Sequence, residues 1–194
     1  MLNIGDIEID MKEGMDMKKV MLLVALFVSL WCNSALAYTD VQLNDDYSLH
    51  EILAKYNQYC RNNMENQDMF NAIVRESPSM VDMNVMDGTT AYATSGIQDV
   101  MIIAGVNGNG KVSRIVLISP SSMENTINGL YAIRLMMVLD PRGDRTTIID
   151  RIATAVSTKS VTFYQSPTQN RIYEFAHTIT SNGGQMTIIG ASVP

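Results

Sequence analysis

The feature that most constrains the fold is a four-residue turn, Asn107-Gly108-Asn109-Gly110, between two apolar runs. Asparagine and glycine tolerate the positive φ angles that a tight hairpin turn requires. The flanking runs, 100–106 and 111–119, are rich in the β-branched residues that favour strands. The sequence therefore predicts a β-hairpin over residues 100–119, and with it an antiparallel sheet.

Two capping boxes indicate where helices begin. Ser48-Leu49-His50-Glu51 precedes apolar residues at helical spacing, which predicts a helix over 48–62 with Cys60 on its core-facing side. Ser121-Ser122-Met123-Glu124 precedes a run that is apolar almost all round from 130 to 139, as in a helix at the centre of a core. Residues 68–76 fit a helix face but form too short a run to decide. The remaining predicted elements are strands at 81–86, 91–94, 161–165, 171–180 and 185–191 and a helix at 147–158.

The order of these elements predicts the fold class. Helices and strands come in groups rather than in alternation, which is typical of α+β proteins with an antiparallel sheet. We expect a sheet of about six to seven strands packed against about three helices. No internal repeat or domain boundary is evident, so residues 38–194 are expected to form a single domain.

Residues 17–37 have the three parts of a bacterial secretory signal peptide in the right order. Lys18 and Lys19 precede an apolar run over 20–30. Ala35 and Ala37 then place small residues at positions −3 and −1 of a cleavage site before Tyr38. We expect an exported protein, periplasmic or secreted, that begins at Tyr38. The alternative is an uncleaved membrane anchor over 20–37, although the apolar run is short for a membrane span.

Residues 1–16 are unusual ahead of such a leader because they are acidic. Lys12-Glu13-Gly14 can be encoded by a purine-rich ribosome-binding sequence at a normal bacterial distance before the Met17 codon. Our hypothesis is that translation starts at Met17 and that residues 1–16 are not part of the protein.

Composition limits both the stabilising chemistry and the partners. The chain has two cysteines, and only Cys60 lies after the predicted cleavage site, so the exported domain must depend on its apolar core. The formal net charge of −6 and the absence of Lys/Arg clusters argue against nucleic acid and against a polybasic membrane patch. Residues 38–47 are polar and are expected to be a mobile lead-in.

Three motifs have ordinary structural interpretations. Gly105 and Gly110-Lys111 match part of a phosphate-binding loop, but Val112 replaces the required hydroxyl and a strand follows, which favours a hairpin turn. Arg142-Gly143-Asp144 spells an integrin-binding tripeptide, yet glycine and aspartate are common between helices. His177 shares a strand face with apolar residues and is expected in the core, whereas His50 is expected to be solvated.

The most unusual feature is methionine, with 15 in the chain and three in Met80-x-x-Met83-x-x-Met86. Thioethers are soft ligands that select Cu(I), which suits an exported copper-binding protein. On a strand, however, Met83 points away from Met80 and Met86, so adaptable core packing is the default interpretation.

The sequence contains no recognisable catalytic or cofactor motif, and no cofactor is predicted. We expect a non-catalytic module of the cell envelope that binds a protein partner or a small ligand. Two alternatives remain open: a methionine-rich Cu(I)-binding protein using Met80, Met83 and Met86, and a hydrolase whose site forms only in three dimensions. Contact with a membrane is expected only through the leader, if it is not cleaved.

Overall fold

The computed structural model describes residues 41–63, 73–81, 89–96, 100–120, 126–180 and 183–193. The chain divides into two compact units, Met1–Ala35 and Leu36–Pro194, and all described residues belong to the second. The elements along the chain are α2 (Leu49–Asn62), β1 (Ser79–Val81), β2 (Thr90–Ser95), β3 (Met101–Val106), β4 (Val112–Pro120), α3 (Thr126–Leu139), α4 (Arg145–Thr158), β5 (Val161–Gln165), β6 (Arg171–Thr180) and β7 (Gly183–Ser192).

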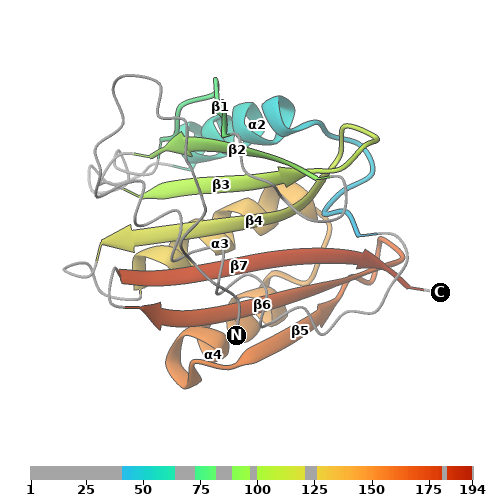
Figure 1. Ribbon diagram of the computed structural model, residues 1–194. Helices are drawn as coiled ribbons and strands as arrows, with labels where there is room; N and C mark the ends of the chain where they lie inside the picture. The colour runs from blue at the N-terminus through green and yellow to red at the C-terminus, as the bar shows by residue number, and fades with distance from the viewer. Residues whose placement is uncertain are drawn as a thin grey trace, which may run out of the picture. The chain divides into compact units, whose positions relative to one another are not determined.

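The strands form one seven-stranded antiparallel sheet in the order β1-β2-β3-β4-β7-β6-β5. The helices of the described part lie together on one face of this sheet (Figure 1). Within their layer α3 contacts both α2 and α4 and packs on β4 and β7. The α+β class, the antiparallel sheet and the numbers of helices and strands are therefore confirmed.

The β3–β4 hairpin forms where the turn sequence predicts it. The backbone N–H of Asn107 donates to the Lys111 carbonyl at 2.8 Å, and the N–H of Gly110 donates to the Asn107 carbonyl at 2.9 Å. Gly110 has a φ of 74°, a conformation that favours glycine. Gly105 lies within β3, so the glycines and lysine of the apparent phosphate loop belong to a strand and a hairpin turn.

The core lies between the helix layer and one face of the sheet. α2 begins at the predicted capping box, in which the Ser48 side chain and the Glu51 side chain each accept a hydrogen bond from the other residue's backbone N–H. Cys60 is buried, as the helical pattern predicts. The largest fully buried apolar side chains are Tyr56, Tyr131, Tyr173, Phe175, Leu43, Ile52, Leu53, Ile102, Ile115, Leu117 and Leu135.

The turn between α3 and α4 explains the Arg142-Gly143-Asp144 tripeptide. The Asp144 carboxylate accepts hydrogen bonds from the backbone N–H groups of Thr146 and Thr147, so it is the N-cap of α4. A Cβ atom at Gly143 would lie 2.5 Å from both the Asp140 carboxylate and the Tyr164 hydroxyl. Packing therefore explains the glycine of this tripeptide, and helix capping explains the aspartate. α4 begins two residues earlier than the apolar pattern predicts.

The prediction of a mobile lead-in is wrong for residues 41–47. Leu43 is fully buried and Asn44 is 3 % exposed. The polar composition of this segment does not predict its burial, because the segment is held mainly by its backbone and by residues far away in the sequence. The predicted elements at 68–76, 81–86 and 121–124 fall largely or entirely on residues 64–72, 82–88 and 121–125, outside the described residues.

Replacing Gly143 with alanine should destabilise the fold by about 1–3 kcal/mol, because the added methyl group would displace the Asp140 and Tyr164 side chains. The free energy of unfolding in urea measures this. The matched control is Gly108→Ala in the hairpin turn, where an added Cβ meets nothing within 4 Å. Equal stability of the two variants would contradict the packing argument.

Candidate functional site

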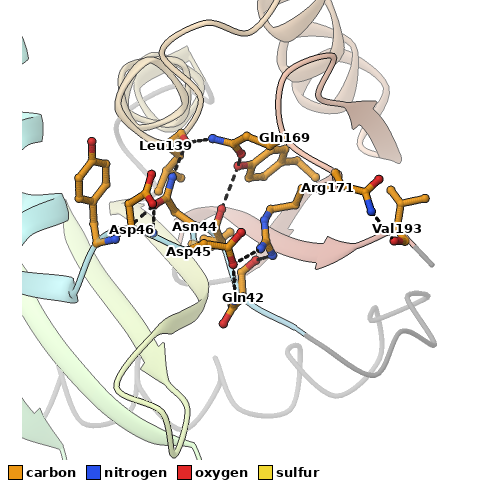
Figure 2. Close-up of polar contacts among 12 residues, drawn as sticks. Gln42, Asn44, Asp45, Asp46, Leu139, Gln169, Arg171 and Val193 are labelled. Atoms are coloured by element: carbon orange, nitrogen blue, oxygen red, sulfur yellow. Dashed lines mark hydrogen bonds and ion pairs between the residues drawn. The ribbon is translucent and has the colours of Figure 1, made fainter.

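A group of polar contacts fixes residues 41–47, here called the strap, to one end of the sheet (Figure 2). Val41 forms an antiparallel bridge with Ala191 of β7. The backbone N–H of Leu43 donates to the carbonyl of Val112, the first residue of β4, at 2.6 Å. The strap therefore bonds to the end of β7 and to the start of β4, beyond the last β4–β7 pair, Arg114–Ile189.

Arg171, the first residue of β6, fastens the strap although its side chain is only 2 % exposed. Its guanidinium lies 2.6 Å from the Asp45 carboxylate and also donates to the Gln42 carbonyl. A buried guanidinium must be paired and hydrogen-bonded to be tolerated. The strap supplies both partners, so Arg171 and the strap depend on each other.

Amide and hydroxyl groups complete the attachment of the strap to α3. The side-chain amides of Asn44 and Gln169 donate to the Leu139 carbonyl at 2.7 and 2.8 Å. They thereby satisfy a carbonyl that the end of α3 leaves without a helical partner. The Tyr173 hydroxyl lies 2.9 Å from the Leu43 carbonyl and 2.5 Å from the Gln169 side-chain oxygen.

Asp140, the residue that follows α3, belongs to the same cluster and is 1 % exposed. Its carboxylate accepts hydrogen bonds from the Tyr164 hydroxyl at 3.1 Å and from the Thr168 hydroxyl at 3.0 Å. The Tyr164 oxygen accepts in turn from the backbone N–H of Asp144 at 3.0 Å. One buried carboxylate thus ties the start of α4 to the β5–β6 turn.

The chemistry of this cluster is that of a clamp. Burial raises the pKa of Tyr164 to about 12, and burial followed by the Asp140 charge raises the pKa of Tyr173 still further. Both phenols are therefore protonated donors at neutral pH. The Asp45 and Asp140 carboxylates are each engaged by donors that the fold supplies. These groups hold the strap and the α3–α4 turn together rather than forming an acid–base pair.

Among the described residues, Asn128 and His177 are buried polar side chains with no hydrogen-bond partner. Asn128, in the first turn of α3, is fully buried, and neither atom of its amide has a partner. His177 on β6 is 1 % exposed, and neither ring nitrogen has a partner. Its place beside Tyr173 and Phe175 confirms the prediction that it is a core residue. His50 is exposed, as predicted.

The face of the sheet opposite the helices, here called the helix-free face, is also apolar. The strand register aligns Ile103, Val116, Thr187 and Ala176 across four strands, and Ile118 and Ile189 lie in the neighbouring rows. These six side chains are buried, whereas Met101, Arg114 and Ile172 on the same face are half-buried. Among the described residues, no helix packs on this face (Figure 1).

The sequence contained a signal for this second apolar face. Residues 115–118 read Ile-Val-Leu-Ile, a continuous apolar run rather than the alternation of a half-buried strand. Such runs are typical of strands that are covered on both faces. Residues 115–118 are therefore the part of the sequence that indicates a second buried face.

The residues predicted from sequence as sites lie mostly outside the described ranges. Met80 is on β1 and is 65 % exposed, whereas Met83 and Met86 are not described. Ala35, Ala37 and Tyr38 of the cleavage site also lie outside. In the part of the chain that the structure describes, no group of three or more His, Cys, Asp and Glu side chains could hold a metal ion. Copper binding and leader cleavage stay predictions.

Comparisons with known proteins give no match to the chain. No protein-family model, no curated protein and no solved structure matches it. Among the described residues, no helix is long and apolar enough to cross a membrane.

Asn128→Leu should raise the free energy of unfolding by about 1 kcal/mol, because it removes a buried amide that has no partner. Asn57→Leu is the matched comparison, since the Asn57 amide bonds the backbone of Val74 at 2.7 and 2.9 Å. We expect that variant to lose about 2–4 kcal/mol. Urea unfolding of both variants measures the contrast, and a similar loss in Asn128→Leu would show that this amide is bonded in solution.

Stability should fall as the pH drops below about 6.5, the ordinary pKa of histidine. Burial, and secondarily the Lys159 charge, lowers the pKa of His177 in the folded chain. The unfolded chain therefore takes up the proton first, and stability decreases until the pH passes the lowered folded pKa. In urea unfolding at about pH 7.5 and pH 5.5, His177→Phe should lose less stability than wild type. The control His50→Gln alters an exposed ring and should behave like wild type; identical losses in all three proteins would exclude His177 as the source.

Proposed function

We propose that this protein is an exported, non-catalytic binding module of the bacterial cell envelope, and that it contacts a protein partner through the helix-free face. The leader-like segment 17–37 supports export, because its charged, apolar and small-residue parts follow in the required order. The observation that carries the binding role is the layering of the domain.

The layering leaves one apolar face of the sheet without a described second layer. A sheet that is apolar on both faces is normally covered on both. Here the described helices all lie on one face, whereas Ile103, Val116, Ile118 and Ile189 occupy the other. These four side chains are at most 4 % exposed in the chain, so the surface offered to a partner is that of Met101 and Ile172, which are half-buried on the same face.

The residues left for a partner decide its chemistry. Met101 and Ile172 are apolar and half-buried on the helix-free face, and apolar side chains gain free energy when they are removed from water. The proposed partner therefore presents an apolar segment to this face.

The proposal predicts a face-specific loss of binding. The chain from Tyr38 to Pro194 should capture a partner by cross-linking in envelope extracts, and Met101→Glu on the helix-free face should reduce the captured amount at least tenfold. The tenfold loss reflects about 1.4 kcal/mol for placing one charge in an apolar contact. The control Ile149→Glu alters an exposed position on α4 and should leave capture unchanged.

Thermal melts of both variants show whether each remains folded. Capture that is equal in wild type and Met101→Glu would contradict the use of this face. Turnover of a peptide or peptidoglycan substrate by the purified chain would replace the binding role with a catalytic one.

A further inference from the structure

The two edges of the sheet differ in how far they are protected against pairing with another strand. β1 is three residues long, and short edge strands offer little to pair with. β5 at the other edge spans Val161–Gln165, has β6 as its only neighbour among the described strands and keeps a continuous register over all five residues (Figure 1). The open edge of β5 is therefore the longer template for a further strand.

The register shows which backbone groups of β5 point away from the sheet. The Ser166 N–H donates to the Arg171 carbonyl at 2.9 Å, which makes this a hydrogen-bonded pair of the antiparallel ladder. Hydrogen-bonded and non-hydrogen-bonded pairs alternate along such a ladder. Thr162 and Tyr164 therefore bond to β6, and Val161, Phe163 and Gln165 direct their N–H and C=O groups outward.

The side chains of β5 lack the features that normally protect an edge strand. Val-Thr-Phe-Tyr-Gln contains no charge and no proline, and its register has no bulge. Val161 is 37 % exposed and Phe163 is 45 % exposed. Ile179, on the part of β6 that extends past the start of β5, is 49 % exposed. Three of the six large apolar side chains that the described part exposes thus lie along one edge.

We propose that β5 of one copy pairs antiparallel with β5 of a second copy, about a two-fold axis at Phe163. This register places Phe163 opposite Phe163 and Val161 opposite Gln165. All the outward backbone groups then meet a partner, because these residues are the ones that direct their groups outward. Aromatic and aromatic–β-branched pairs across strands add to the backbone bonds.

The composition of the edge favours a second copy over a foreign strand. A two-fold contact must be self-complementary, and an uncharged strand with an aromatic residue at its centre meets that condition. Lys159, just before the strand, would lie opposite Pro167 of the other copy, so the register does not oppose like charges. The two sheets would join into one, with both helix-free faces on the same side.

Sedimentation velocity of the chain from Tyr38 to Pro194 tests the proposal, since this chain contains nearly all of the compact unit Leu36–Pro194. We expect a monomer–dimer equilibrium at micromolar concentrations that Phe163→Lys abolishes. Met80→Lys is the matched control, because it places the same charge at an exposed position on the opposite edge strand and should leave the dimer intact. Amide hydrogen exchange gives a second readout: Val161, Phe163 and Gln165 should become protected as concentration rises.

Three results would overturn this inference. They are a wild-type chain that stays monomeric at about 100 µM, a dimer that Phe163→Lys leaves intact, and unprotected amides at 161, 163 and 165 in the dimer. A monomeric chain that captures an envelope protein in a Phe163-dependent manner would assign the edge to a foreign strand instead. The proposed binding role of the helix-free face is independent of these outcomes.

Discussion

The pairing of β4 with β7 is the contact on which the rest of the structure depends. It joins two antiparallel meanders, β1 to β4 and β7 to β5, over a register that runs from Arg114–Ile189 to Pro120–Gly183. Every other strand pair connects neighbours in the chain, whereas this one spans both helices α3 and α4. α3 packs on both strands of the pair, so the apolar helix and the central ladder stabilise each other. A chain that failed to form this pair would have two separate sheets, each with an uncovered edge.

The strap depends on the same junction. β7 continues past Ile189, the last of its residues that pairs with β4, so the end of β7 has no β4 residue bonded to it. Val41 and Leu43 fill the gap, and Arg171 and Tyr173 of β6 hold them there. The buried polar groups of the clamp are thus a consequence of an uneven sheet, because the strap must be fixed by side chains where no regular ladder exists.

Interactions between residues close in the sequence predict most of the helices and strands. Contacts between residues far apart in the sequence cannot be predicted from it. The Asn107–Gly110 turn predicted its hairpin, and Ser48 with Glu51 predicted the start of α2, because these effects act within four residues. The order of the strands in the sheet cannot be predicted from the sequence, because tertiary packing decides that β4 pairs with β7. The strap was missed because its partners Arg171 and Tyr173 lie about 130 residues away in the sequence.

Several side chains with reactive chemistry serve the fold itself. Asp140, Arg171 and Tyr173 would attract attention as reactive groups, yet each is engaged in holding the strap or the α3–α4 turn. Asp144 caps a helix in the same way. What the described part leaves exposed includes Val161 and Phe163 on the edge strand β5. Apolar side chains and free backbone groups at a strand edge are the means by which proteins associate, and this is the physical ground on which we propose a binding role.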